Sequence, residues 1–201
     1  MTEPTLQLDP IREDILSWAA PLWLEESGAF RDGVLEESSL QASLFLCYIL
    51  YSIDGLDAFE HRRGQWVQWI QAQQSEQDGS FSFSPAIGSA RPRKGIALWN
   101  AVRGLNILGA QIERLPRYQR STHTVEGLRD WFETWKAWGD PHHEVLSLVP
   151  TLVSHPDPAL VEAFFDELAD QQHPTQGIWP RGDKPAKLVT EGWFKIICIN
   201  F

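Results

Sequence analysis

The side chains best suited to acid–base chemistry lie together in the segment Asp140-Pro141-His142-His143-Glu144. A histidine here could act as general base or acid, and Asp140 could orient its ring, so we take Asp140, His142 and His143 as candidate catalytic residues. The structural alternative is that Asp140 caps a helix, with Pro141 at its first position and Glu144 in its first turn. No metal site is expected, because adjacent helical residues diverge by about 100° and neither histidine has another at i+4.

Basic residues gather just before a predicted helix, although the protein is acidic overall. Arg91 and Arg93, together with Lys94, occur in the segment SARPRKG. They could hold a carboxylate, sulfate or phosphate, because arginine and lysine donate charged hydrogen bonds to such groups. Arg91 and Arg93 are therefore candidate substrate-binding residues, and the alternative is an ordinary solvated loop.

Aromatic residues on the more apolar predicted helices form a further candidate set. Tyr48, Trp99 and Trp193 could stack on a sugar ring or cover an apolar ligand, and the alternative is that they belong to the core. Arg103 lies one helical turn after Trp99 and would need a partner if it were buried. Trp99, Arg103 and Trp193 are accordingly taken as candidate substrate-binding residues.

Helical periodicity accounts for most of the chain, and convincing β alternation is absent, so the fold is predicted to be all-α. The first, third, fifth and seventh helices are amphipathic, as in a surface layer, whereas the others are more apolar and are predicted to pack on more than one side. The predicted helices cover residues 9–24, 40–53, 57–74, 94–108, 122–138, 142–153 and 157–168, and an eighth begins near residue 190.

A nine-residue pattern occurs twice where a predicted surface helix ends: QQSEQDGSF at 73–81 and QQHPTQGIW at 171–179. The glycine allows a positive φ after the helix, the glutamine amide can bond backbone groups left unpaired at a helix end, and the aromatic side chain can shield that bond from water. Glycines that mark the links between helices are separated by 51, 60 and 38 residues, which predicts a repeat of helical hairpins with a degraded third copy. These glycines are Gly28, Gly79, Gly139 and Gly177.

The two nine-residue segments resemble the QW repeats of squalene–hopene cyclases and related repeats in protein prenyltransferase β subunits. The family pattern is a glutamine, a short spacer, a glycine, any residue and a tryptophan, and Phe81 replaces the tryptophan in the first segment. The resemblance implies an α/α toroid, in which inner helices surround a central cavity and outer helices enclose them. The matching residues are Gln74, Gly79 and Phe81 in the first segment and Gln172, Gly177 and Trp179 in the second.

The sequence departs from the family in length and in chemistry. About four hairpins fit into this chain, whereas a ring of six would need roughly 300 residues, so we expect an incomplete or open ring. Residues 1–201 are expected to form a single domain, either the N-terminal part of a longer toroid or a ring completed by a homodimer or another partner. The aspartate-rich cyclase motif and the Asp-x-Cys zinc motif of the prenyltransferases are absent, so the activity does not follow from the architecture, and no cofactor is expected.

Composition restricts the partners and the compartment. The net charge of −10 argues against nucleic acid and against anionic membrane surfaces. No run of about eighteen apolar residues is present, so no transmembrane segment is expected, and the first ten residues do not resemble a signal peptide. Cys47 and Cys198 lie in apolar segments and are predicted to be buried free thiols, so a cytoplasmic location is expected.

Three functions remain as expectations. The first is a terpenoid-cyclase- or prenyltransferase-like domain that binds or transforms a hydrophobic, isoprenoid-type ligand. The second is a polysaccharide lyase or glycoside hydrolase of toroid type, in which Asp140 and the two histidines act on a carbohydrate and Arg91 and Arg93 hold its uronic acids. The third is a noncatalytic helical-repeat scaffold, whose exposed apolar surface binds a protein.

Overall fold

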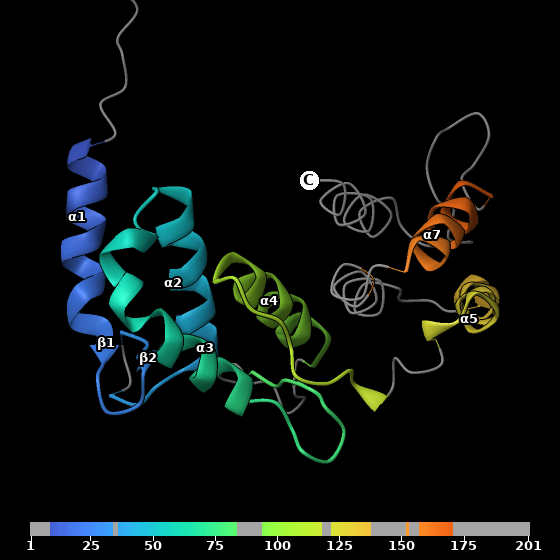
Figure 1. Ribbon diagram of the computed structural model, residues 1–201, viewed down its shortest axis with the longest axis horizontal. Helices are drawn as coiled ribbons and strands as arrows, with labels where there is room; N and C mark the ends of the chain where they lie inside the picture. Colours follow the sequence, from blue (N-terminus) through green and yellow to red (C-terminus); the bar gives the residue numbers. More distant parts are fainter. Residues whose placement is uncertain are drawn as a thin grey trace, which may run out of the picture.

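A computed structural model describes residues 9–33, 36–83, 94–117, 122–137, 152 and 157–170. Within these ranges the chain is mostly helical, as the sequence predicts, and it also contains a small two-stranded sheet (Figure 1). The predicted eighth helix lies outside the described residues, and so does nearly all of the segment 142–153.

The first helix, α1 (Asp9–Ala19), begins where predicted but ends before residue 24. A 3-10 turn (Ala20–Leu22) follows it. Pro21 explains this ending, because proline has no backbone N–H and its ring would clash with the carbonyl group four residues earlier in a continuing α-helix.

The chain then forms a two-stranded antiparallel sheet that the sequence analysis did not predict. Strand β1 (Trp23–Leu24) pairs with β2 (Ala29–Phe30), so that Trp23 lies opposite Phe30. Each strand has two residues, which is too short to display the alternation of a longer strand. The all-α prediction did not include this sheet, and the described part of the chain remains mainly helical.

The second helix, α2 (Leu40–Ser52), is capped by Ser39, whose Oγ accepts a hydrogen bond from the Ala42 N–H at 3.3 Å. At the other end, Gly55 N–H donates to the Leu50 carbonyl at 2.7 Å, and Asp54 has a φ of 53°. This geometry is a Schellman ending, with Asp54 at the position that glycine usually occupies.

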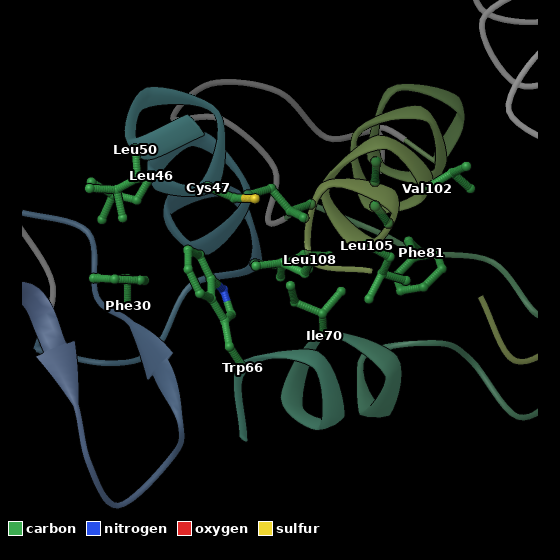
Figure 2. Packing of buried hydrophobic residues seen from close by; sticks show 14 of the residues in the cluster. Phe30, Leu46, Cys47, Leu50, Trp66, Ile70, Phe81, Val102, Leu105 and Leu108 are labelled. Atoms are coloured by element: carbon green, nitrogen blue, oxygen red, sulfur yellow. The ribbon is translucent and has the colours of Figure 1, made fainter. Parts of the chain in front are cut away.

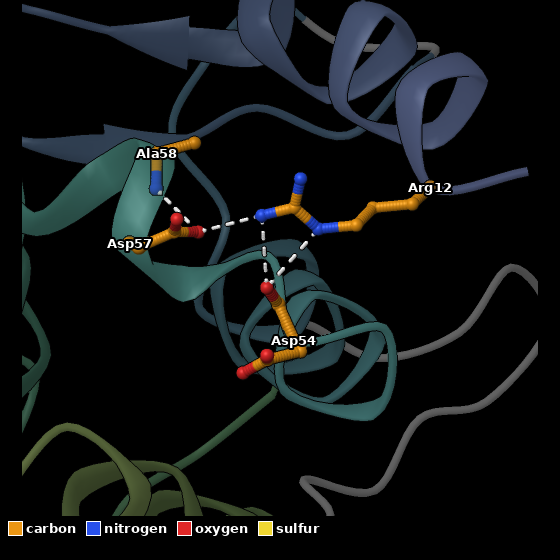
Figure 3. A network of polar contacts seen from close by, with 4 residues as sticks. All are labelled: Arg12, Asp54, Asp57 and Ala58. Carbon is orange, nitrogen blue, oxygen red and sulfur yellow. Dashed lines mark hydrogen bonds and ion pairs between the residues drawn. The ribbon is translucent and has the colours of Figure 1, made fainter. Parts of the chain in front are cut away.

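Arg12 ties α1 to this ending of α2 (Figure 3). Its Nε and Nη2 donate to the Asp54 carbonyl at 3.2 and 3.0 Å, and Nη2 also lies 3.0 Å from Asp57 Oδ1. Asp57 Oδ1 in turn accepts from the Ala58 N–H at 3.0 Å. The first two helices are therefore joined by the small sheet at one end and by Arg12 at the other.

A second pair of helices, α3 and α4, follows α2. A 3-10 segment (Leu56–Arg62) leads into α3 (Arg63–Ala72), so the predicted helix 57–74 is α-helical only in its second part. The following helix, α4 (Lys94–Ile107), agrees closely with the prediction. α2 contacts α1, α3 and α4, and α3 contacts α4, so the two hairpins form one array.

The main core lies where α2 and α4 pack over α3. Trp66 and Ile70 point from α3 toward the two helices above it, where Cys47 and Leu105 meet them (Figure 2). Phe30 of β2 extends the same core, and its ring centroid lies 4.9 Å from that of Trp66. Most positions of α4 and the sides of α2 that face α3 and α4 are therefore buried, whereas Phe45 and Ile49 of α2 lie outside this core.

A second, smaller core forms between α5 (Val125–Ala137) and α7 (Pro158–Asp170). Asp157 caps α7, because its Oδ1 accepts a hydrogen bond from the Ala159 N–H at 3.0 Å. Phe132 and Phe164 meet in this core with ring centroids 5.7 Å apart. Phe165, the next residue of α7, is 43% exposed.

Candidate functional site

Most of the predicted site residues lie outside the described part of the chain. Trp99 and Arg103 are described, and both lie on α4. The candidates outside the described ranges are Asp140, His142, His143, Arg91, Arg93 and Trp193, together with the second glutamine–glycine–aromatic segment at 171–179.

In the first of the two repeated segments, Gln74 bonds backbone groups, as predicted, but these belong to the glycine turn and to the segment after α4 and not to a helix end. Its Nε2 donates to the Gly79 carbonyl at 2.8 Å and to the Arg114 carbonyl, and its Oε1 accepts from the Arg114 N–H at 3.2 Å. Gln74 is 4% exposed and Phe81 is fully buried. We call this set of three hydrogen bonds the Gln74 clasp, and it joins the end of α3 to the segment after α4.

The turns at Gly28 and Gly79 have the same local geometry, although the first retains little of the motif. Their φ angles are 72° and 71°, and each N–H donates to the carbonyl four residues earlier, at 2.9 and 2.8 Å. A buried phenylalanine follows each glycine after one residue. A Cβ at Gly28 would lie 3.0 Å from Gln65 Cβ, and one at Gly79 would lie 3.0 Å from the Leu115 carbonyl oxygen. A later segment of the chain thus lies directly against each glycine, so both positions require the absence of a side chain.

In the first hairpin, a serine of α2 bonds to the backbone of the turn that contains Gly28. This serine was not among the predicted site residues. Ser43 is fully buried on α2, and its Oγ accepts from the Phe30 N–H at 3.0 Å and donates to the Phe30 carbonyl at 3.4 Å. Trp23 occupies the position that corresponds to Gln74, five residues before the glycine. A buried serine in an otherwise apolar helix was the available signal, because such a hydroxyl group needs a partner.

The two described candidates on α4 contact each other and α2. Arg103 Cζ lies over the Trp99 ring, 4.7 Å from its centroid, and over the Tyr48 ring at 5.7 Å. Trp99 and Tyr48 are half-buried, and Arg103 is exposed. The rings and the cation attract each other, because the face of an aromatic ring carries partial negative charge. We call Tyr48, Trp99 and Arg103 the cation–aromatic cluster.

Tyr48 is fixed within this cluster by a hydrogen bond across the two helices. Its hydroxyl group donates to the Asn100 carbonyl at 2.7 Å. Burial raises the pKa of Tyr48 well above its usual range, and the nearby positive charge of Arg103 opposes this only in part. Tyr48 is therefore neutral near pH 7, and its single proton is already used in a hydrogen bond.

An apolar stripe on α2 continues from the cluster. Phe45 is 42% exposed and Ile49 is 37% exposed, and both lie on the side of α2 that also carries Tyr48. Phe45 packs against the buried Phe83 with ring centroids 6.4 Å apart, which supports it from one side. The prediction that α2 packs on several sides is correct for most of the helix, but this stripe is left exposed. We call Phe45 and Ile49 the α2 stripe.

A separate hollow lies beside the turn between β1 and β2. Its volume is about 440 Å³, and four glutamates contribute to its lining, so it repels anions. Among the described residues, no three histidine, cysteine or acidic side chains are placed to hold a metal ion. These glutamates are Glu25, Glu26, Glu36 and Glu37.

The helices of the described ranges are all too short or too polar to cross a membrane. Cys47, in the same ranges, is a buried free thiol, as predicted, whereas Cys198 lies outside them. Comparison with known proteins finds no match: no family model matches the chain, and neither does a curated protein or a solved structure.

Proposed function

We propose that this chain is a helical-hairpin repeat domain of the α/α-toroid type that binds an apolar, isoprenoid-type ligand on its inner helices, α2 and α4. The α2 stripe is the observation that carries the proposal. Phe45 and Ile49 are 42% and 37% exposed, so each forgoes about 0.6–1.2 kcal/mol, roughly two fifths of what full burial would supply. A ligand that covers them would recover part of that free energy, and Trp99 would extend the apolar surface onto α4.

The repeated turns support the architectural part of the proposal. Two successive hairpins have the same glycine geometry and the same buried aromatic residue, as expected for copies of one unit. The second helix of each hairpin is the more apolar one: α2 carries the exposed Phe45 and Ile49, and α4 carries the half-buried Trp99. In a toroid, the second helix of each hairpin would face the central cavity.

Binding, and not catalysis, is what the described residues support. Tyr48 stays neutral near pH 7, and an arginine is a permanent cation, so the cation–aromatic cluster has no group that exchanges protons at that pH. Any transformation of the ligand would depend on the candidate acid–base residues Asp140, His142 and His143.

Calorimetric titration with farnesol, an uncharged isoprenoid, tests the proposal. The variant Phe45→Ser/Ile49→Ser should bind farnesol at least about tenfold more weakly than the wild type, because it removes much of the apolar contact area. The matched control is Ile11→Ser/Trp18→Ser, which changes two exposed apolar residues on α1 and should bind as the wild type does. Absence of farnesol binding to the wild type, or equal binding by both variants, would refute the proposal.

The two alternatives make different predictions. A polysaccharide lyase or glycoside hydrolase would bind acidic oligosaccharides through Arg91 and Arg93 and would be insensitive to changes in the α2 stripe. A noncatalytic scaffold would use the α2 stripe for an apolar helix of a partner protein, as grooves between helices commonly do. Farnesol binding that depends on Phe45 and Ile49 separates the first function from both.

A further inference from the structure

We infer that the ligand is an amphiphile with a single carboxylate, which the guanidinium of Arg103 binds while the apolar part lies on the α2 stripe. This inference rests on the proposed function for the position of the apolar part. The head group of the ligand is a carboxylate, and Arg103 selects it.

Among the described residues, Arg103 has no carboxylate partner, whereas most of the other arginines have one. No ion pair or hydrogen bond of its guanidinium is found among the described residues, although the protein carries a net charge of −10. An exposed arginine without a partner, next to an apolar surface, is suited to bind an external anion. Five other arginines pair with acidic side chains: Arg12, Arg62, Arg63, Arg114 and Arg129.

The cation–aromatic cluster also holds the guanidinium in a defined position. Its Cζ lies over the Trp99 ring, 4.7 Å from the ring centroid, and over the Tyr48 ring, at 5.7 Å. The N–H groups of a guanidinium point outward in its plane, so contact with the rings leaves them available at its edge. A carboxylate can accept two parallel hydrogen bonds from this edge, and the rings reduce the entropy lost on binding.

The local charge favours a carboxylate over a diphosphate. α2 contains no basic residue, and Arg103 is the one basic residue of α4 after Lys94. One guanidinium balances the single charge of a carboxylate, whereas a diphosphate carries more charge and usually needs several cations or a metal ion. The acidic character of the whole protein adds a further penalty for a multiply charged ligand.

The test compares three ligands that have the same alkyl chain: decanoate, 1-decanol and decyl phosphate. Calorimetric titration near pH 7 should show that the wild type binds decanoate about tenfold more tightly than 1-decanol, because charged hydrogen bonds add to the apolar contact. Arg103→Gln should abolish this preference and leave binding of 1-decanol unchanged. Arg117→Gln, which removes the same charge from another exposed arginine, should retain the preference.

The outcomes distinguish this inference from the proposed function. Equal binding of decanoate and 1-decanol, tightest binding of decyl phosphate, or a loss of both ligands in Arg103→Gln would overturn the carboxylate assignment. If decanoate binding depends on Arg103 but not on Phe45 and Ile49, the anion site stands and the proposed apolar site does not. If farnesol binds through the α2 stripe but Arg103→Gln does not weaken decanoate binding, the proposed apolar site stands and the carboxylate site does not.

Discussion

The substitution Gln74→Glu keeps the shape of the side chain and removes the two hydrogen-bond donors of the Gln74 clasp. In the native protein, Nε2 donates to the carbonyl groups of Gly79 and Arg114, and Oε1 accepts from the Arg114 N–H. After the substitution, an ionised carboxylate would face two carbonyl oxygens in a site that is 4% exposed. The acceptor contact to the Arg114 N–H can persist, so the variant tests the donor contacts specifically.

The expected effect at about pH 7 is a decrease of about 3–5 kcal/mol in the free energy of unfolding. Each of the two carbonyl groups loses its partner, and an unsatisfied buried polar group costs about 1–3 kcal/mol. Burial of the new negative charge adds to this cost. Such a decrease is a large fraction of the roughly 5–15 kcal/mol that stabilises a typical domain.

The deficit should shrink when the pH is lowered. Burial and the two carbonyl groups raise the pKa of the introduced carboxyl above about 4.3, its value in the unfolded chain. The folded variant then binds the proton more tightly than the unfolded chain does, so its stability falls as the pH rises from that value through the folded pKa. Near pH 4 the protonated carboxyl can also donate one hydrogen bond, so the variant should approach the wild type there.

Urea denaturation followed by far-ultraviolet circular dichroism, at about pH 4 and about pH 7, measures both effects. The control is Gln73→Glu, since the side chain of Gln73 is exposed and bonds only to the Trp69 carbonyl, at 3.2 Å. It should change stability by no more than about 0.5 kcal/mol. Equal losses in the two variants, or a Gln74→Glu deficit that does not depend on pH, would contradict the role assigned to the clasp.

Two further predictions concern α2. Asp54→Gly should raise the free energy of unfolding by about 0.5–1 kcal/mol in the same urea assay, because it relieves a positive φ and removes a negative charge from a helix C-terminus. The hydrogen bond from Arg12 to the carbonyl of residue 54 is retained in this variant. A less stable variant would contradict the Schellman assignment. Cys47 should resist iodoacetamide at about pH 8.5 and react in urea, because burial raises its pKa from 9.0 to about 12. The pKa of this thiol is higher in the folded state, so the free energy of unfolding should fall as the pH rises from 9.0 to about 12, and Cys47→Ala should lose that part of the pH dependence. Alkylation of Cys47 in the native protein, detected by mass spectrometry of its peptide, would contradict the burial of this thiol.

Helix starts and the bond from Gln74 to the Gly79 carbonyl depend on local chemistry and could be predicted from sequence, whereas the two bonds from Gln74 to Arg114, in the segment after α4, could not. Ser39 and Asp157 cap the helices that follow them, and a serine or aspartate directly before an apolar periodic segment carries this information within a few residues. The glutamine–glycine–aromatic spacing was similarly informative, because an amide near a helix end has few partners other than backbone groups.

Features that depend on distant segments were not accessible in this way. The pairing of Trp23 with Phe30 needs the core beneath it, and the bond from Ser43 to Phe30 links residues that only the folded hairpin brings together. The exposure of Phe45 was also unpredictable, because helical periodicity gives no direction for a helix that is apolar nearly all round. For the candidate site, sequence placed Trp99 and Arg103 one turn apart, whereas their contact with Tyr48 depends on how α2 and α4 pack.

The glycines at 28 and 79 imply an order of assembly. Each is covered by residues about one hairpin further along the chain, Gln65 in one case and Leu115 in the other. Each of these two turns is therefore closed by a segment that is synthesised after the turn itself. A nascent chain can add its hairpins one at a time, in the order in which they leave the ribosome.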